Sequence, residues 1–462
     1  MKKISFILLF GVALVTQGCK SFLDGNEISP NSPVSATPAL LLSTVEVSTF
    51  ANFSGQLSRS SSILMQQSQG VLNQAEDVAI YTILEGDNTN EWSSIYTGAL
   101  NNSKALMDLA GDKSPNYRGI AKILYALNLG LATDIWGDVP NSDALKGLTG
   151  QIDAKYDSQE AIYAAIQAML SDAIVDLGKT SNLIEPGDDD YIFKGDTDKW
   201  IATANALKAR YANHLSKKSN YSPTTVLANA NAALATMTAN GAADAKCVFT
   251  AAGNELNQWY AYNDQRGDYI KMGKFFIDLM ANTNDPRLAK YATKDAAGGY
   301  SGSPLANDPT SKDRSAMGTY FGTDAAPIPL VTYVELKFIQ AEAMFRMGNK
   351  IDAATAFNTA VIDNITQVTG AAPTAAYIAA SASETDATIT LEKIMTQKYI
   401  AMFTQPEVWT DWRRTGFPTL AADTRGAVID IPRRFPTPLT ERLYNPKATV
   451  ISNILTKMWW DN

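Results

Sequence analysis

Residues 333–364 read YVELKFIQAEAMFRMGNKIDAATAFNTAVIDN, and this stretch decides the fold. Apolar residues recur in it every three to four positions, which is the pattern of two amphipathic helices. Gly348–Asn349 interrupts the pattern and forms a turn between the helices. Ala341 and Ala353 are small enough to let the two helices approach closely, and Phe357 fills the gap between them. The stretch therefore predicts an antiparallel helix pair.

The spacing of small and large residues in this pair is that of a tetratricopeptide unit. Other stretches rich in Ala and Leu also carry apolar residues at helical spacing, although no strict repeat is visible. Helices are expected at residues 40–68, 92–110, 117–136, 158–177, 197–218, 224–238, 330–347, 350–366 and 389–404. We therefore expect a mainly α fold, an α-superhelix of tetratricopeptide-like helix pairs. An unrelated helical bundle would have a similar composition and is the alternative.

Residues 240–330 differ in composition, because Gly, Asn, Asp, Pro and Tyr accumulate there. We expect long loops in this insertion, with one helix near residues 269–282. The last 50 residues are rich in Pro, Arg and Trp and are expected to be mostly irregular. Long loops in an ordered protein are usually functional. These loops are therefore the expected ligand-binding half of the molecule.

The N-terminus has the pattern of a lipoprotein signal. Two lysines precede an apolar run at residues 4–15, which is too short to span a bilayer. A small residue and then Cys19 follow this run. We predict that residues 1–18 are a signal peptide, that Cys19 is lipidated, and that residues 19–38 tether the lipid to a single domain at 39–462. Ordinary secretory cleavage, which would leave a free cysteine, is the alternative.

Charge and reactive residue types exclude several classes of function. The 462 residues include 39 basic and 47 acidic ones, for a formal charge of −8. This balance argues against electrostatic binding of nucleic acid. The chain has only two cysteines and one histidine, which nearly excludes Cys/His zinc sites and disulfide frameworks. We expect no catalytic residue, metal or cofactor.

Three groups of charged or titratable residues are candidates for chemical sites. His214 has no GxSxG nucleophile motif to serve, and we expect it on a helix surface or partly buried. Asp188–Asp190 lacks the spaced ligands of a calcium loop, so we expect a solvated loop before a helix. Asp411, Arg413 and Arg414 could clamp an anion, but their neighbouring tryptophans and Gly favour a structural ion pair at a helix end.

The best binding candidates are aromatic residues with hydrogen-bonding neighbours. Residues 258–266 read QWYAYNDQR and are expected to form a loop. Aromatic faces can stack on a sugar or a peptide, while Asn and Arg bind polar groups. Alternatively, one or two of these rings fix the loop to the helices. The candidate ligand-binding residues are Trp259, Tyr260, Tyr262, Asn263, Arg266, Tyr300, Tyr320 and Tyr81.

Short segments in a fixed order extend over nearly the whole chain. They are Cys19–Asp24, Asn26, Pro30–Asn31, Trp92–Tyr96, Asn101–Asn102, Ala121–Ala126, Trp136–Pro140, Asp188–Tyr191, Gly195–Asp196, Lys199–Trp200, Ala204–Tyr211, Asp285–Arg287, Ala341–Ala343, Trp409–Gly416, Arg433–Pro436 and Asn445–Pro446. Together they resemble the SusD/RagB family of outer-membrane nutrient-binding lipoproteins. Gln397–Tyr399 and the RRTGFP motif at residues 413–418 are similar to the SusD-like 2 subgroup.

This resemblance implies a fold and a role. The fold would be a superhelix with four tetratricopeptide-like units packed on a loop-rich half. The protein would capture an oligomeric nutrient outside the cell. A glycan is the favoured nutrient, and a peptide is the alternative. It would deliver the nutrient to a SusC-like TonB-dependent β-barrel transporter, and it would not be an enzyme. The alternatives are a helical-repeat scaffold that binds a protein partner and, less favoured, a surface hydrolase.

Overall fold

The structure is a computed structural model that describes residues 36–462. The expected signal peptide, Cys19 and residues 19–35 of the tether lie outside the described residues, so these assignments stay predictions, as does the single domain at 39–462. Between residues 36 and 462, no helix is both long and apolar enough to cross a membrane.

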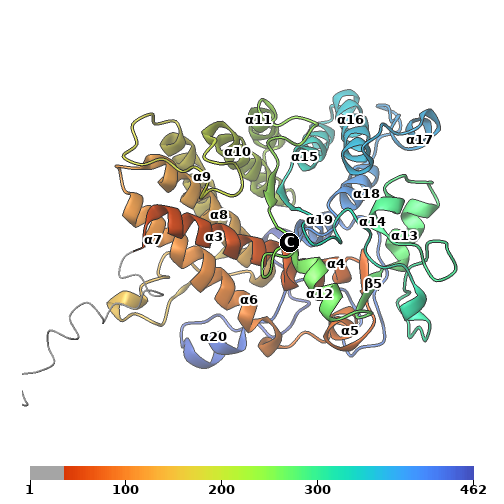
Figure 1. Ribbon diagram of the computed structural model, residues 1–462, viewed down its shortest axis with the longest axis horizontal. Coiled ribbons are helices and arrows are strands. Elements are labelled where there is room, and N and C mark those ends of the chain that lie inside the picture. Colours follow the sequence, from red (N-terminus) through yellow and green to blue (C-terminus); the bar gives the residue numbers. More distant parts are fainter. Residues whose placement is uncertain (1–35) are drawn as a thin grey trace, which may run out of the picture.

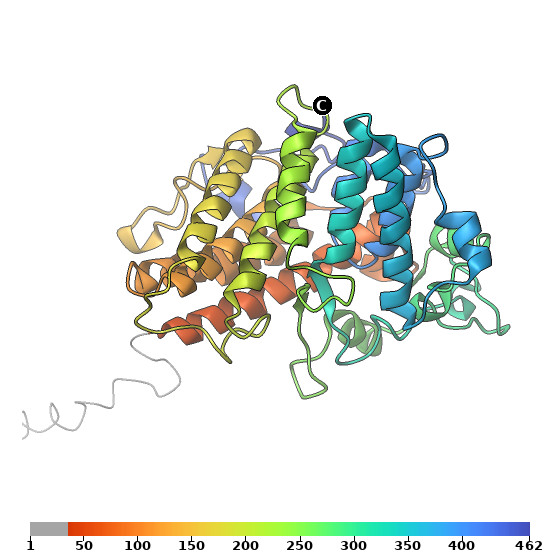
Figure 2. The ribbon, with the colours of Figure 1, turned by 90° about the horizontal axis from the view of Figure 1, so that it is seen from above.

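Helix pairs form one side of the molecule, as the sequence predicts. Figure 2 shows helices of these pairs side by side in a row. Within the row, α9 also contacts α10 and α11 contacts α15. The packed pairs are α8 (Pro115–Trp136) with α9 (Gln159–Leu177), α10 (Thr197–His214) with α11 (Pro223–Leu234), and α15 (Tyr333–Arg346) with α16 (Lys350–Thr369). The prediction of a mainly α fold with tetratricopeptide-like pairs is therefore confirmed.

The α15–α16 pair has the expected turn and packing. Gly348 takes a φ of 81°, a conformation that favours glycine, and the chain reverses there. Ala341 and Ala353 are fully buried between neighbouring helices. The rings of Phe338 and Phe357 meet edge to face, with 6.3 Å between their centroids. The small residues and the aromatic pair thus determine how closely these helices pack.

The helices predicted at 40–68 and 92–110 are each interrupted. The first consists of α3 (Pro38–Ser54) and α4 (Gln56–Leu64), separated at Gly55. A side chain at Gly55 would collide with the carbonyl oxygen of Ala51. The second consists of α6 (Thr89–Ser93), the π-helical η2 (Ser94–Leu100) and α7 (Asn101–Ala110). The chain after α4 leaves the helical path and forms a strand instead.

The described strands are short and pair over long sequence distances. The antiparallel pairs are β1 (Ser68–Gly70) with β5 (Ile270–Met272), β2 (Val139–Pro140) with β3 (Tyr156–Asp157), and β4 (Ala245–Cys247) with β6 (Ile328–Val331). The pairing of β1 with β5 joins the N-terminal helices to the 240–330 insertion. In Figure 1, α4 accordingly lies together with α5 (Asn73–Ala79), which follows β1, and with α12 (Gln258–Gln265), which precedes β5.

The 240–330 insertion contains more helix than predicted. The helix expected near 269–282 begins only at residue 274, because residues 270–272 form β5. The helices of the insertion are α12 (Gln258–Gln265), α13 (Lys274–Ala281) and α14 (Leu288–Tyr291). The remaining described elements are α5 (Asn73–Ala79), α17 (Ala375–Ser381), α18 (Leu391–Ala401), α19 (Glu407–Thr415), α20 (Leu439–Tyr444), and the short helices η1 (Glu85–Asn88), η3 (Gly147–Thr149), η4 (Ser311–Asp313) and η5 (Trp459–Asp461).

Candidate functional site

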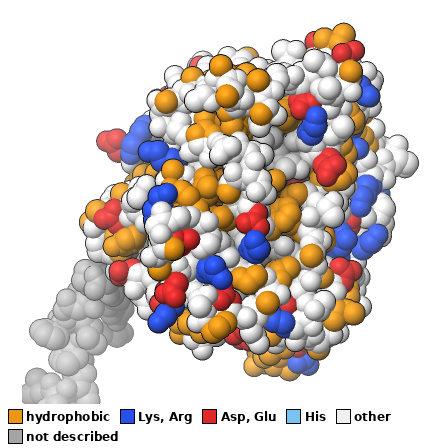
Figure 3. Space-filling model, turned by 90° about the vertical axis from the view of Figure 1, so that its right-hand side faces the viewer, with side chains coloured by type: hydrophobic (Ala, Val, Ile, Leu, Met, Phe, Trp, Pro, Cys, Tyr) orange, Lys and Arg blue, Asp and Glu red, His pale blue; other side chains and the backbone are white. Residues whose placement is uncertain are grey.

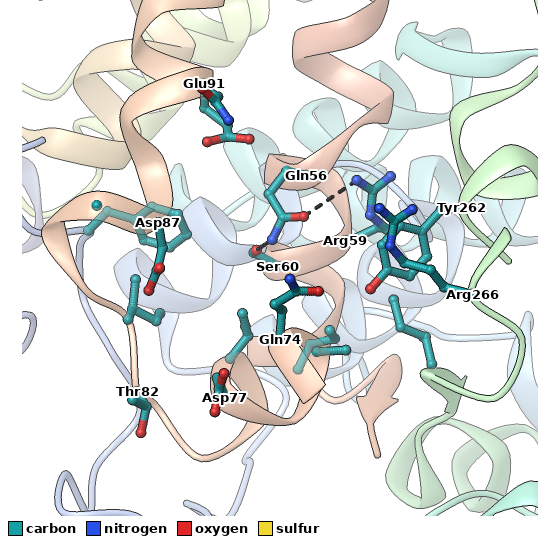
Figure 4. Close-up of a pocket in the computed structure, with 18 residues that line it drawn as sticks. Gln56, Arg59, Ser60, Gln74, Asp77, Thr82, Asp87, Glu91, Tyr262 and Arg266 are labelled. Atoms are coloured by element: carbon teal, nitrogen blue, oxygen red, sulfur yellow. Dashed lines mark hydrogen bonds between the residues drawn. The ribbon is translucent and has the colours of Figure 1, made fainter. Parts of the chain in front are cut away.

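A cavity of about 430 Å³ opens where α4, α5, α6 and α12 meet (Figure 4). Its volume lies within the range of roughly 300–1,000 Å³ that small-molecule sites occupy. Most of its lining side chains are polar. The lining residues are Gln56, Arg59, Ser60, Ile63, Gln74, Ala75, Asp77, Val78, Thr82, Ile83, Gly86, Asp87, Asn90, Glu91, Tyr262, Arg266, Ile270 and Phe435.

One wall of this cavity combines an aromatic ring with two guanidinium groups. The guanidinium carbon of Arg59 lies 4.3 Å from the centroid of the Tyr262 ring, and that of Arg266 lies 5.2 Å from it. Arg59 comes from α4, Tyr262 from α12, and Arg266 directly follows α12. In Figure 4 the three side chains lie together. The ring attracts both cations, so it already has two cation–π contacts.

Arg59 makes only long hydrogen bonds, although its charged side chain is half-buried. Its Nη1 donates to the carbonyl oxygen of Gln258 at 3.3 Å, and its Nη2 to Oε1 of Gln56 at 3.4 Å. Its Nε is enclosed and has no hydrogen-bond partner. Burial lowers the pKa of Arg59 to about 10. The hydrogen-bonding capacity of the guanidinium is therefore only partly satisfied within the protein.

Carboxylates lie away from this wall in the same cavity. In Figure 4, Asp77 and Asp87 are on the side opposite Tyr262, and Glu91 is near the α6 end. Asp77 and Asp87 are exposed, whereas Glu91 is half-buried. Oε2 of Glu91 is enclosed without a partner, and burial raises the pKa of this carboxyl group. The cavity thus presents hydrogen-bond donors on one side and acceptors on the other.

A second cavity of about 270 Å³ shares the wall of Arg59, Tyr262 and Arg266. Its other lining residues are Gly253, Asn254, Leu256, Gln258, Ala261 and Gln265. The three shared side chains thus form a partition between a larger and a smaller cavity.

The structure separates the predicted residues of the 258–266 segment into two groups. Tyr262 and Arg266 line both cavities. Tyr260 and Asn263 are half-buried on α12 and are not among the lining residues of either cavity. The expectation that this segment is a loop is wrong, because the Asn257 side chain accepts hydrogen bonds from the first backbone amides and starts α12.

Trp259 is a core residue. Its side chain is fully buried, with 0% of its surface exposed. Its Nε1 donates a hydrogen bond to Oγ of Ser58 at 2.9 Å, which satisfies its only polar atom. Neither ring face is open to a ligand in this arrangement. The prediction that Trp259 stacks on a ligand is therefore wrong, and its ring fastens α12 to α4.

The other predicted aromatics do not belong to these cavities. Tyr81 is buried, with 4% exposed, and its hydroxyl accepts a hydrogen bond from the Asp423 amide at 2.9 Å. The prediction that Tyr81 lines the binding face is thus wrong. Tyr300 is half-buried beneath Lys294, whose Nζ lies 4.0 Å from the ring centroid. Tyr320 lines a separate cavity of about 100 Å³. These three rings therefore do not share a site with Tyr262.

His214 is more deeply buried than expected, with 1% of its surface exposed. Its Nε2 lies 2.6 Å from Oε1 of Glu407, and its Nδ1 lies 2.8 Å from the hydroxyl of Tyr163. Asp134, His214 and Glu407 offer ligand atoms within 4.8 Å of one another, as a metal site would. Because the protein itself already hydrogen-bonds both ring nitrogens, this cluster is best described as an internal polar network.

Of the two remaining charged groups, one was predicted wrongly and the other correctly. Asp190 is fully buried rather than solvated, and it accepts hydrogen bonds from the amides of three following residues and from Nε1 of Trp200 at 2.7 Å. The prediction of a wholly solvated loop is wrong at this position. The structural role predicted for Asp411 and Arg414 is confirmed by their buried 2.7 Å ion pair. Arg413 donates instead to the carbonyl oxygens of Asp134 and Arg433.

Sequence reasoning missed Arg59 and Glu91. The signal for Arg59 was present, because it is the only charged residue between Glu46 and Glu76. A lone charge on an otherwise uncharged and largely buried helix needs a reason. Glu91 carried no comparable signal.

Comparisons with known proteins agree with this architecture. A model of the SusD-like 2 family, described as starch-binding and associating with the outer membrane, matches residues 30–438. A SusD/RagB family protein from Bacteroides thetaiotaomicron is 24% identical, with a TM-score of 0.78, and the alignment covers 92% of this chain and 99% of that chain. A chitin-binding SusD homologue from Flavobacterium johnsoniae is 22% identical, with a TM-score of 0.78 and coverage of 91% and 98%.

A SusD homologue from Bacteroides fragilis is 22% identical, with a TM-score of 0.75 and coverage of 92% and 100%. No curated protein sequence matches the chain. The structural likenesses show the fold, and the family model, which spans most of the chain, shows the membership. The chain belongs to the SusD-like 2 family, whose members are described as starch-binding and associating with the outer membrane.

Proposed function

We propose that this protein is a cell-surface lipoprotein that binds an oligosaccharide nutrient in the 430 Å³ cavity beside Tyr262. The family consists of nutrient-binding proteins rather than enzymes. The observation that carries the proposal is a cavity of ligand size lined by amides, hydroxyls, guanidinium groups and carboxylates. Groups of these kinds exchange hydrogen bonds with the many hydroxyls of a sugar.

The aromatic residue of this cavity has a different task from the one expected. The Tyr262 ring already contacts the guanidinium groups of Arg59 and Arg266. In our proposal it holds these two donors in position, and the sugar is recognised chiefly by polar contacts. Ordering donors before the ligand arrives reduces the entropy lost on binding.

A binding measurement tests the site. The full-length chain in detergent is applied to a glycan and peptide array, and the strongest ligand is then titrated calorimetrically. Tyr262→Leu removes the ring but keeps an apolar side chain, and we expect it to weaken affinity about tenfold or more. Tyr191→Leu, the same change at a ring 40% exposed and outside both cavities, is the matched control. Unchanged affinity in the Tyr262 variant would place the ligand elsewhere.

The same proposal includes lipidation at Cys19 and delivery of the nutrient to a SusC-like TonB-dependent β-barrel transporter. Family membership and the N-terminal sequence support both. Affinity-tagged chain, extracted from outer membranes in mild detergent, should co-purify with a large β-barrel protein. Cys19→Ala should release the chain from the membrane fraction. A variant that stays in that fraction would contradict the lipid anchor.

A further inference from the structure

Arg59 and Arg266 are unusual among the arginines of this protein because they lack acidic partners. Over residues 36–462, neither guanidinium lies within salt-bridge distance of a carboxylate. Most other arginines of the described chain are paired, as Arg314 is with Asp308 at 2.8 Å and Arg425 with Asp423 at 2.7 Å, whereas Arg413 and Arg434 also lack a carboxylate partner. The wall shared by the two cavities thus keeps two cations that have no carboxylate in direct contact, although Glu91 acts on Arg59 from across the larger cavity.

These two unpaired cations lie close to each other. Both guanidinium groups contact the same Tyr262 ring, at 4.3 and 5.2 Å from its centroid. Like charges that share one small ring repel, and the repulsion is stronger where water is partly excluded. A negative charge placed between them would offset this repulsion and give both guanidinium groups an acceptor.

The smaller cavity is the place where an anion would meet no negatively charged lining residue. Apart from Arg59 and Arg266, its lining residues are neutral: Gly253, Asn254, Leu256, Gln258, Ala261, Tyr262 and Gln265. The larger cavity, by contrast, is also lined by Asp77, Asp87 and Glu91. These carboxylates repel an anion but accept hydrogen bonds from hydroxyls. The two sides of the Arg–Tyr–Arg partition therefore favour different chemical groups.

We propose that the ligand is an acidic oligosaccharide: the smaller cavity takes a carboxylate or sulfate group, and the larger cavity takes the hydroxyls of a neighbouring sugar residue. This inference rests on the proposed glycan-binding function and specifies its ligand class. A guanidinium is a planar fork of donors that matches both kinds of oxyanion. Tyr262 positions the two forks, and no salt bridge to either of them has to be broken before a ligand anion binds.

Titration of the full-length chain with matched tetrasaccharides tests the inference. The probes are tetragalacturonate, a sulfated maltotetraose, and the neutral maltotetraose and chitotetraose. At low salt we expect one of the anionic probes to bind about tenfold more tightly than the neutral ones. High salt should reduce this advantage, since it screens the charges. The better of the two anionic probes identifies the group as carboxylate or sulfate.

Variants that remove one positive charge show whether Arg59 and Arg266 cause the preference for anionic probes. Arg266 is exposed, so Arg266→Gln leaves the packing intact and keeps an amide donor, and we expect it to weaken the anionic probe about tenfold more than the neutral probes. Arg59→Gln should act in the same direction. Lys350→Gln removes an exposed positive charge at the start of α16, outside both cavities, and should change neither affinity.

The possible failures are distinguishable. If neutral probes bind as tightly as the anionic ones, and Tyr262→Leu abolishes both, the acidic-ligand inference is overturned while glycan binding at this site stands. Equal losses for neutral and anionic probes in Arg266→Gln would also overturn the inference. If none of the four tetrasaccharides binds, the inference fails, and a glycan and peptide array without any glycan signal would remove the proposed function as well.

Discussion

Arg414 of α19 and Glu342 of α15 form a two-pronged ion pair, in which Nη1 donates to Oε1 and Nη2 to Oε2, each at 2.5 Å. Both side chains are fully buried. Burial alone would raise the pKa of Glu342, but the positive charge of Arg414 holds it well below its usual range. The pair therefore fastens the C-terminal helix α19 to the tetratricopeptide-like α15–α16 pair.

Glu342→Gln should destabilise the protein by about 3–5 kcal/mol, because it leaves Arg414 buried without its main counter-charge. The loss is measured as a fall in the midpoint of thermal and urea unfolding. Asp108→Asn provides the control, since it breaks the exposed Lys104–Asp108 pair, and this change should cost less than about 1 kcal/mol. Equal small effects from both substitutions would contradict a structural role for the buried pair.

Trp259→Phe should lower stability without changing ligand affinity. The variant loses the hydrogen bond from Nε1 to Ser58 and leaves a small cavity between α12 and α4, at a cost of about 1–3 kcal/mol. Thermal unfolding and calorimetric titration of the same samples separate the two effects. Tyr260→Phe, a smaller change at a half-buried neighbour, is the control. If the variant loses ligand affinity while its unfolding midpoint is unchanged, Trp259 is part of the binding site.

The sequence predicted local features well. The small residues and the Gly348 turn determine the α15–α16 pair through contacts between neighbouring turns, and helical spacing reports such contacts directly. The structural role of Arg414 was likewise predicted from its tryptophan neighbours. Its partner Glu342 was not, because it lies 72 positions away and hydrophobic periodicity carries no information on which distant charges meet.

The same limit explains the partial success at the candidate site. Tyr262 and Arg266 were predicted because aromatic and polar residues alternate in one short segment. Composition does not distinguish which ring of that segment faces inward, and Trp259 is buried by Ser58, which is 201 positions away. Arg59, next to Ser58, reaches Tyr262 across the same distance in sequence. The β1–β5 pairing, itself too short to predict, helps to bring the two segments together.

Cys247 should be unreactive in the folded protein. Its thiol is fully buried, and burial raises its pKa well above the usual value, so almost no thiolate forms near neutral pH. Native protein treated with iodoacetamide should show no alkylation at residue 247 by mass spectrometry, whereas urea-unfolded protein should be alkylated there. Val248→Cys introduces a thiol at a neighbouring position that is 46% exposed and should react without urea. Fast native alkylation of Cys247 would show that the β4–β6 region opens.

Glu46 is a buried carboxyl group next to another one. It is fully buried on α3, and its Oε2 accepts a hydrogen bond from the Tyr191 amide at 2.7 Å. Its Oε1 is enclosed and has no hydrogen-bond partner. Burial, and next the negative charge of the neighbouring Asp190, raise the pKa of Glu46 well above its ordinary value of 4.5. Folding thus favours the protonated form of Glu46.

This shift gives the stability contribution of Glu46 a definite sign. Above about pH 4.5 the unfolded chain releases the proton that the folded protein keeps, so the free energy of unfolding falls as pH rises towards the raised pKa. Glu46→Gln mimics the protonated form and should remove this slope. At pH 8 we therefore expect the variant to be more stable than the wild type.

Thermal unfolding between pH 5 and pH 8 measures the effect, since the gap between variant and wild type should widen with pH. Glu160→Gln, at the exposed start of α9, is the matched control and should give a gap that does not widen in this direction. A Glu46→Gln variant that becomes less stable than the wild type as pH rises would show that the folded protein holds Glu46 as a carboxylate. Two negative charges, on Glu46 and Asp190, would then share one buried site, stabilised against burial and mutual repulsion by the amides and the Trp200 indole that donate to them.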